Sequence, residues 1–361
     1  MLRIGLALAL ALLAACEKPA PPPPPPPAAP DPAVIEKAAE QGGQTLRRVR
    51  ARGVLNCGVN AGLVGFANPD GRGVWRGFDA DVCRAVATAV FGRADRVAFT
   101  PLSTANRFEM LKAGRVDVLA RNTAVTFSRD VELAVDFPAI SYYDGQGFLV
   151  RRSLALTSAS ELGGAKVCVL AGGTAALNVA DYFRGRGLEY EPVVLPTETE
   201  VRSAYAAELC DAYAGAISSL ASARVLLSEP GANVILADVI AKQPLGPAVR
   251  QGDARWADTV RWTVYAMVLA EELGVTSRNV DTLRETSTDP EVRRLLGLEG
   301  GLGRMLGLND DWAYQIVKQV GNYGEVFERN LGAESPLELQ RGLNAPWNAA
   351  TPGLMYAPPL R

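Results

Sequence analysis

Between residues 54 and 92, apolar residues recur first at strand-like and then at helix-like spacing. Residues 54–59 form a short β-type run, and apolar side chains from Phe78 to Val90 then recur at helical spacing until Gly92. Alternation at Val97 and Phe99 predicts a second strand, 107–112 a short helix, and 116–119 a third strand. This β-α-β-α-β order predicts a parallel sheet with right-handed crossovers.

A second copy of the same order begins at Lys166. Strands are predicted over 167–170, 193–195 and 211–214, with helices over 174–183 and 198–208 between them. The chain enters this second unit at 146–150 and leaves it at 246–249, so two crossings form a hinge. A ligand is expected between the two units, at the carboxyl ends of the strands.

The predicted fold class is therefore α/β with two lobes, each a mainly parallel sheet flanked by helices. Lobe 1 is expected to comprise residues 46–147 and 250–361, and lobe 2 residues 148–249. An amphipathic helix is predicted from Ala254 to Leu273, with Asp253 as its cap. Residues 275–361 read as mixed helix and loop, and their periodicity does not place them. They are assigned to lobe 1 as a C-terminal helical extension.

The first 45 residues are typical of targeting and tethering. Arg3 precedes an apolar run over residues 4–15, which is shorter than the roughly 20 residues of a membrane-spanning helix. Residues 13–16, Leu-Ala-Ala-Cys, resemble the lipobox of bacterial lipoproteins. We therefore expect a signal peptide over 1–15 and lipidation of Cys16. The alternative is an ordinary signal peptide followed by a free cysteine.

Residues 16–45 are predicted to be a lipid-attached, proline-rich linker. Seven consecutive prolines, Pro21 to Pro27, exclude helix and sheet and favour a polyproline stalk. The expected location is periplasmic, with a lipid anchor in a bacterial membrane.

Four cysteines remain beyond Cys16, which is an even number in an exported chain and suggests disulfides. The sequence allows three connectivities. We favour Cys57 with Cys83 and Cys168 with Cys210, because each pair then joins a strand to a helix inside one half of the chain. Four buried thiols are the alternative.

Composition excludes several classes of function. The chain has 361 residues and a net charge of -2, which predicts about two domains and gives no basic surface for nucleic acid. It has no histidine, which excludes Ser-His-Asp and Cys-His catalysis and HExxH metal sites. Binding, or chemistry by carboxylates, lysine, tyrosine or arginine, remains. We expect no metal and no cofactor.

Several motifs carry a family resemblance that spans about residues 48–361. They are Gly65-Phe66-Ala67-Asn68-Pro69-Asp70, Trp75 to Ala85, Arg121-Asn122-Thr123, Phe127-Ser128-Arg129-Asp130, Tyr142 to Phe148, Asp289 to Arg294 and Gly321 to Glu325. Together they resemble the substrate-binding proteins of polar amino acid ABC importers, solute-binding protein family 3, and most of all the general L-amino-acid-binding type. The resemblance implies a type II periplasmic-binding-protein fold that binds an amino acid or related small carboxylate between its lobes. It also implies a monomer that delivers the ligand to an ABC permease and is not an enzyme.

Arg129 is the first candidate ligand-binding residue. It follows the third predicted strand, and its planar, permanently charged guanidinium can donate two parallel hydrogen bonds to a carboxylate. In the family, the arginine at this place binds the ligand α-carboxylate. A surface arginine paired with Asp130 is the alternative.

Further candidates are predicted on both lobes. Asn122 and Thr126 precede Arg129, and Thr174 begins a helix whose free N–H groups suit an anion. The resemblance adds a first loop whose side chains contact the ligand, here Phe66, Asn68 and Trp75. Loop packing is the alternative for these three, a strand-end role for Thr126 and a tight turn for Thr174.

The sequence departs from the family where an amino acid would be held. Ala124 stands where a Ser or Thr is usual, and Ala216 where an aspartate pairs with the ligand α-ammonium. Ser218 or Ser219 offers only a neutral hydrogen bond there. Removing one partner of a buried ion pair costs about 3 to 5 kcal/mol. Two alternatives to transport therefore stay open: a degenerate fold acting as a surface interaction or sensory lipoprotein, and an exported dehydratase-like enzyme.

Overall fold

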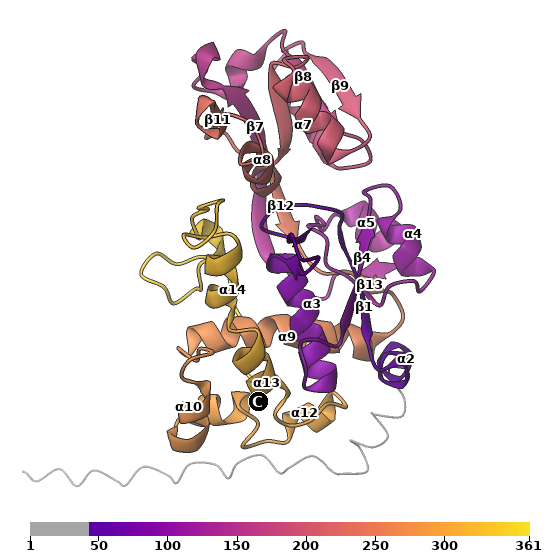
Figure 1. Cartoon of the computed structure of the whole chain (residues 1–361), viewed down its shortest axis with the longest axis vertical. Helices are drawn as coiled ribbons and strands as arrows, with labels where there is room; N and C mark the ends of the chain where they lie inside the picture. Colours follow the sequence, from indigo (N-terminus) through magenta and orange to yellow (C-terminus); the bar gives the residue numbers. More distant parts are fainter. Residues whose placement is uncertain (1–42) are drawn as a thin grey trace, which may run out of the picture.

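The computed structural model describes residues 43–361, which form two lobes joined by a pair of extended strands (Figure 1). The predictions for the signal peptide, for Cys16 and for most of the proline-rich linker lie outside the described residues. Between residues 43 and 361 there is no helix of the length and hydrophobicity needed to cross a bilayer.

Lobe 1 contains the predicted parallel sheet. Its order is β4-β1-β5, with β1 (Leu55–Asn60) at the centre, β4 (Val97–Leu102) on one side and β5 (Val118–Leu119) on the other. Helix α3 (Phe78–Phe91) connects β1 to β4 and ends at Gly92, whose φ of 68° is the left-handed conformation that favours glycine. Helix α4 (Arg107–Lys112) has the predicted bounds.

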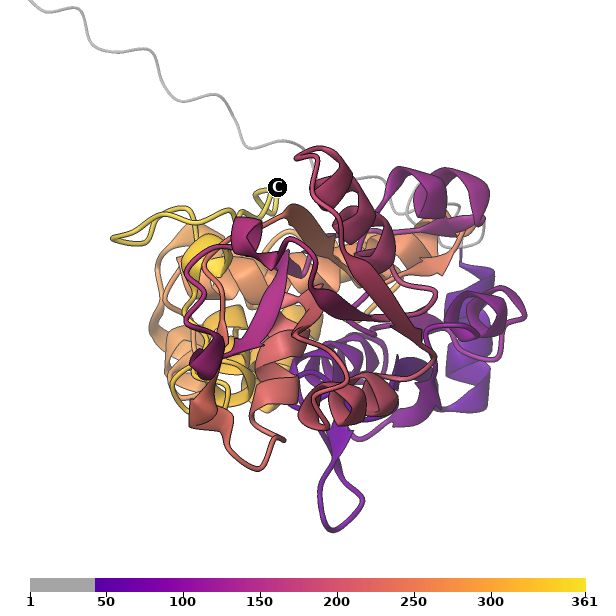
Figure 2. The same ribbon diagram turned by 90° about the horizontal axis from the view of Figure 1, so that it is seen from above.

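Lobe 2 is a larger, mixed sheet with the order β11-β7-β10-β8-β9 (Figure 2). Strands β8 (Lys166–Leu170), β9 (Glu191–Leu195) and β10 (Ala212–Ala216) are parallel, as predicted. Helix α6 (Ala175–Arg184) follows β8, and α7 (Glu198–Ala206) follows β9. The apolar faces of both helices bury against this sheet.

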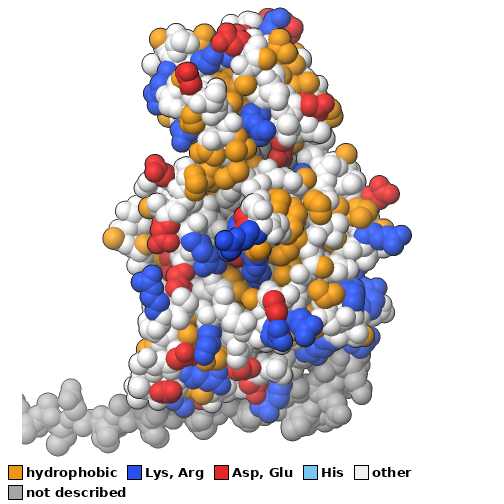
Figure 3. Space-filling model, in the orientation of Figure 1, with side chains coloured by type: hydrophobic (Ala, Val, Ile, Leu, Met, Phe, Trp, Pro, Cys, Tyr) orange, Lys and Arg blue, Asp and Glu red, His pale blue; other side chains and the backbone are white. Residues whose placement is uncertain are grey.

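Two paired strands form the hinge. Strand β7 (Tyr142–Arg151) runs antiparallel to β12 (Ala241–Leu245), and it also pairs with β10 and with β11 (Asn233–Ile235). At the return crossing, the backbone of Gly246 lies against the carbonyl of Ala139, where a Cβ would collide. The molecule narrows at this level, and hydrophobic side chains gather there on the face shown in Figure 3.

The C-terminal extension packs on lobe 1. Helix α9 (Ala254–Glu272) buries the predicted face, including Trp256, Val260, Val264 and Met267. Helices α13 (Trp312–Gln319) and α14 (Tyr323–Asn330) lie against α9, and α13 also lies against α3. The segment that periodicity did not place thus completes the largest hydrophobic core.

The remaining elements are short. They are α2 (Gln44–Arg52), β2 (Asn68–Pro69), β3 (Trp75–Arg76), α5 (Phe127–Glu132), β6 (Val135–Asp136), η1 (Arg152–Leu154), η2 (Ala159–Leu162), α8 (Ile217–Arg224), η3 (Pro230–Ala232), β13 (Val249–Arg250), α10 (Val280–Thr286), α11 (Pro290–Leu295), α12 (Leu302–Met305) and η4 (Gly342–Asn344).

Both predicted disulfides are present. Cys57 in β1 joins Cys83 in α3, with 6.1 Å between their Cα atoms, and Cys168 in β8 joins Cys210, with 5.7 Å. Cys210 lies in the turn between α7 and β10 rather than in a helix. Each bridge stays within one lobe, so neither restricts rotation about the hinge.

Candidate ligand-binding cleft

A cleft of about 600 Å³, including its open mouth, lies between the lobes. Its wall is built from the carboxyl ends of parallel strands on both sides: Thr104 follows β4, Arg121 follows β5, Thr174 follows β8, Glu198 follows β9, and Ala216 ends β10. Strands that run in the same direction end at the same edge of a sheet, so residues distant in the sequence meet there.

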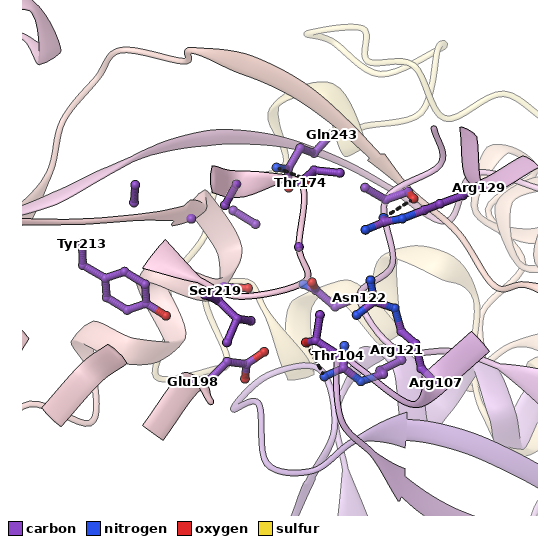
Figure 4. Close-up of a pocket in the computed structure, with 17 residues that line it drawn as sticks. Thr104, Arg107, Arg121, Asn122, Arg129, Thr174, Glu198, Tyr213, Ser219 and Gln243 are labelled. Carbon is purple, nitrogen blue, oxygen red and sulfur yellow. Dashed lines mark hydrogen bonds between the residues drawn. The ribbon is translucent and has the colours of Figure 1, made fainter. Parts of the chain in front are cut away.

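Three arginines of lobe 1 converge on this cleft, and we refer to Arg107, Arg121 and Arg129 as the arginine cluster (Figure 4). The Arg121 side chain donates from Nε to the Leu102 carbonyl at 2.8 Å and from Nη2 to Thr104 Oγ1 at 3.1 Å. Arg129 donates from Nη1 to the Ala124 carbonyl at 2.7 Å. These bonds fix two of the guanidinium groups at the cleft wall.

The third arginine lacks an acceptor for one of its donors. Arg107 is 4% exposed, and its Nε is the buried side-chain nitrogen that has no hydrogen-bond partner among residues 43–361. Its guanidinium lies 4.8 Å from the centre of the Phe108 ring. A buried, unsatisfied donor is costly, so this nitrogen is an unfavourable feature of the wall as it stands.

The cluster is electrostatically strained. Burial, and then repulsion by Arg121 and Arg129, lower the pKa of Arg107 to about 8. Burial is also the main reason why the pKa values of Arg121 and Arg129 are lowered. Because like charges disfavour one another's charged form, an anion in the cleft would stabilise all three.

Lobe 2 contributes one acidic side chain. Glu198 is the first residue of α7, after the cap Thr197, and it faces the cleft opposite Arg121 (Figure 4). Asn60, at the end of β1, donates from Nδ2 to both Glu198 carboxylate oxygens, at 3.2 and 3.4 Å. This contact joins the two lobes directly. The negative charge of Glu198 favours the protonated forms of Arg107 and Arg121.

Five residues of the lobe 2 wall are glycine or alanine, beside the larger side chains of Leu170 and Tyr213. Gly173, Ala175, Ala214, Gly215 and Ala216 present backbone and methyl groups to the cleft. Thr174 precedes α6, and its Oγ1 accepts a hydrogen bond from Gln243 Nε2 of β12 at 3.4 Å. Gln243 in turn donates to Gln146 of β7 at 3.0 Å. The hinge strands therefore position the start of α6 at the cleft.

A polar network beside the cleft crosses the hinge. The backbone N–H of Asn122 donates to Asp79 at 2.7 Å, and its side-chain amide donates to Ser218 Oγ at 3.3 Å. Ser218 Oγ donates to Asp144 of β7. Burial raises the pKa of Asp79 to about 7 and that of Asp144 to about 6.

Three of the predicted ligand-binding residues, Arg129, Asn122 and Thr174, lie together on the cleft wall. Thr126 and Ser218 lie next to it but have other contacts. Thr126 caps α5 by accepting from the Arg129 N–H, and Ser218 is fully buried in the hinge network.

The three candidates from the first loop lie elsewhere in lobe 1. Phe66 is fully buried and packs its ring against Phe78 and Tyr142. Trp75 packs against Phe99, with the ring centres 5.9 Å apart. The Asn68 amide donates to the Pro69 carbonyl in the β2–β3 hairpin. The packing alternative describes the placement of Phe66 and Trp75.

Sequence reasoning missed six polar residues of the wall: Thr104, Arg107, Arg121, Glu198, Tyr213 and Gln243. Arg107, Arg121 and Glu198 each follow a strand of a predicted parallel sheet, and this position was the available signal. Gln243 gave none. The two alanines singled out in the sequence, Ala124 and Ala216, do line the cleft, so side-chain oxygens are missing where expected. Glu198 nevertheless supplies a carboxylate on the lobe 2 side.

Two lobes on a double-stranded hinge, with a polar cleft at their strand ends, define a type II periplasmic binding protein. Solved structures agree: an ABC transporter periplasmic binding protein from Brucella ovis, with glutathione bound, matches with a TM-score of 0.86 and 51% identity over 88% of this chain and 99% of that one. Residues 55–278 match the model of the bacterial extracellular solute-binding proteins, family 3. The chain belongs to this family, as the sequence motifs predicted.

Full-length relatives have similar descriptions. The general L-amino acid-binding periplasmic protein AapJ of Rhizobium johnstonii is 51% identical over 319 residues, which cover 88% of this chain and 93% of the relative. The glutamate/glutamine/aspartate/asparagine-binding protein BztA of Rhodobacter capsulatus is 51% identical over 317 residues, with the same coverage. These are binding proteins, which confirms the prediction that the chain is not an enzyme.

Proposed function

We propose that this chain is the periplasmic binding protein of an ABC importer, and that its ligand carries two carboxylates and one ammonium group. The charged side chains of the cleft are three arginines and one glutamate, a surplus of two positive charges before the ligand enters. A ligand with two anionic groups and one cationic group matches both signs. Acidic amino acids and small acidic peptides have this pattern of charges.

The observation that carries the proposal is the convergence of three arginines on the cleft, where Arg121 and Arg129 repel the charge of Arg107. A single carboxylate held by Arg129 would leave Arg107 and Arg121 without an anionic partner from the ligand. A second carboxylate would pair with Arg107 and Arg121 by charge-assisted hydrogen bonds, which are about twice as strong as neutral ones. The descriptions of BztA, which name glutamate and aspartate, and of the Brucella protein, which name glutathione, are consistent with this chemistry.

Each side chain then has a role. Arg129 binds the first carboxylate, the Thr174 hydroxyl and the N-terminus of α6 reach the ligand when lobe 2 closes, and Glu198 accepts hydrogen bonds from the ligand ammonium. Glu198 thus takes the role of the aspartate that relatives have at the position of Ala216. Closure is stabilised only by contacts that the ligand makes with both lobes.

Isothermal titration of the purified chain tests the proposal. Glutamate, aspartate and glutathione should bind more tightly than glutamine or leucine, and Arg107→Met should remove most of this preference. Arg115→Met, which removes an exposed arginine just before β5, should leave the preference for acidic ligands unchanged. Equal affinity for leucine and glutamate would overturn the proposed ligand class. Silence across amino acids, peptides and simple carboxylates would favour an interaction or sensory protein.

We also propose that the protein is a monomer, lipid-anchored through Cys16 at a bacterial membrane and held off it by residues 16–45. Lobe 1 would comprise residues 46–147 and 250–361, lobe 2 residues 148–249, and the closed form would deliver its ligand to a permease. Palmitate labelling that Cys16→Ala abolishes would support the anchor; labelling that persists in this variant would refute it.

A further inference from the structure

A second pocket adjoins the main cleft at Glu198. It has about 280 Å³ of space, including its mouth, and it shares Glu198, Tyr213 and Ser219 with the main cleft. Its other lining residues are Gly62, Leu63, Val64, Arg202, Ser222, Ala223 and Leu226, so both lobes contribute. The shared residues lie together on one side of the main cleft (Figure 4).

Two lining residues of this pocket make hydrogen bonds between the lobes. Glu198 accepts from Asn60 Nδ2 at 3.2 Å, and Ser222 Oγ of α8 donates to the Val64 carbonyl at 2.6 Å. Ser222 is 1% exposed. The pocket is therefore a part of the interface between the lobes that small side chains leave unfilled.

Arg202 is the positively charged side chain of the second pocket, which Glu198 also lines. It lies one helical turn after Glu198 on α7, yet no ion pair or hydrogen bond of its side chain occurs between residues 43 and 361. Its charge acts on the buried Tyr213, whose hydroxyl group points toward Glu198 in Figure 4. Along the cleft the order of charges is thus the arginine cluster, then Glu198, then Arg202.

We propose that the second pocket binds the distal carboxylate of an extended ligand, a short acidic peptide, with Arg202 as its partner. This inference rests on the proposed function and assigns the peptide, rather than the free amino acid, as the ligand that fills the whole site. The amino-terminal end of the peptide occupies the main cleft, its ammonium pairs with Glu198, and its chain passes Ser219 and Tyr213 to reach Arg202.

Titration calorimetry with glutamate and glutathione tests the subsite. Arg202→Gln should weaken glutathione binding about tenfold or more, since one charge-assisted contact contributes roughly 1.5–3 kcal/mol, and should change glutamate binding less than twofold. Arg224→Gln, which removes a charge from α8 outside both pockets, should affect neither ligand. Leu226→Trp, at an exposed position of the pocket, should also weaken glutathione selectively by filling the space.

The ligand supplies the complementary change. We expect glutathione whose glycine carboxylate is converted to an amide to bind the wild-type protein as weakly as unmodified glutathione binds the Arg202→Gln variant. The Arg202→Gln variant should bind the amide no more weakly than the wild-type protein does. Equal losses for glutamate and glutathione in Arg202→Gln would overturn the subsite, because Arg202 would then act on closure. If the wild-type protein binds glutamate but not glutathione, the subsite is overturned and the proposed function stands. If it binds neither ligand, both proposals are overturned.

Discussion

The two walls of the cleft differ in how they would hold a ligand. Lobe 1 presents three long, charged arginine side chains, two of them fixed by backbone carbonyls. Lobe 2 presents glycine and alanine backbone, the start of α6 and one carboxylate. One wall is therefore specific through charge, and the other through close approach of its backbone.

This difference suggests an order of events. A cluster of positive charge raises the local concentration of anions and accelerates their capture. The small residues of lobe 2 contribute only when the lobe comes within hydrogen-bond distance, so they act on the closed state. The C-terminal extension packs behind lobe 1, so the charged wall is supported by the larger lobe and the larger hydrophobic core.

The largest loss of affinity is expected when a charge is removed from the lobe 1 wall. We expect Arg129→Ala to weaken binding of glutamate or glutathione by roughly 30-fold to several thousand-fold, because truncating one partner of a buried charge pair costs about 2–5 kcal/mol. Calorimetry of this variant beside Arg115→Ala, an exposed control, provides the measurement. Unchanged affinity would remove Arg129 from the site.

Removing each disulfide in turn compares the stability of the two lobes. Replacing Cys168 and Cys210 with serine opens a loop of 42 residues, and replacing Cys57 and Cys83 opens one of 26. Chain entropy predicts a loss of about 3–4 kcal/mol in each case, slightly larger for lobe 2.

Denaturant unfolding of both double variants, followed by ligand titration under native conditions, would check this. We expect each variant to unfold at lower denaturant and still bind its ligand, since neither bridge crosses the hinge. Loss of binding in a folded variant would contradict the assignment of the bridges to single lobes.

A smaller effect is expected from the charge on lobe 2. Glu198→Gln should weaken binding of glutamate by about 10- to 100-fold, because a hydrogen bond to a charged group contributes roughly 1.5–3 kcal/mol. Glutarate, which has two carboxylates and no ammonium, should bind this variant at least as well as the wild type. If glutarate loses as much affinity as glutamate, Glu198 acts on closure and not on the ammonium.

The smallest expected effect is a dependence of stability on pH. Burial raises the pKa of Asp79 to about 7, above its unfolded value, so the native state binds this proton more tightly than the unfolded state. The resulting stability is complete below the unfolded pKa near 4 and is lost as the pH rises through 7.

Thermal melts from pH 5 to pH 8 should therefore show a falling melting temperature. Asp79→Asn keeps an oxygen that can accept from the Asn122 N–H and should flatten this profile. Asp144, at the hinge with a pKa of about 6, contributes in the same direction and remains in the variant. An unchanged slope would exclude Asp79 as a cause.

The sequence predicted most of the fold because its apolar positions report local geometry. Helix α4 and both disulfide pairs agree with the prediction, as does the buried face of α9. The extension after residue 275 could not be placed, because its helices are short and their apolar faces are defined only by the α3 and α9 surfaces that they cover.

The site was predicted only in part. Arg129 was proposed from its motif and from the chemistry of a guanidinium, and it lies on the cleft wall, whereas Phe66 is a core residue and Trp75 is partly buried against Phe99. Glu198 was not considered as a replacement for the missing aspartate at Ala216, because Glu198 begins α7 after β9 whereas Ala216 ends β10, and the two residues meet only in three dimensions.

Local spacing and periodicity were enough to predict the order of strands and helices, the two cysteine pairs and Arg129 as the candidate for carboxylate binding. The folded arrangement was needed to show that three arginines converge, that Arg107 Nε has no acceptor and that Glu198 faces the cluster. Such encounters depend on which strand ends meet at a sheet edge and on how two lobes pack, and neither follows from spacing along a chain.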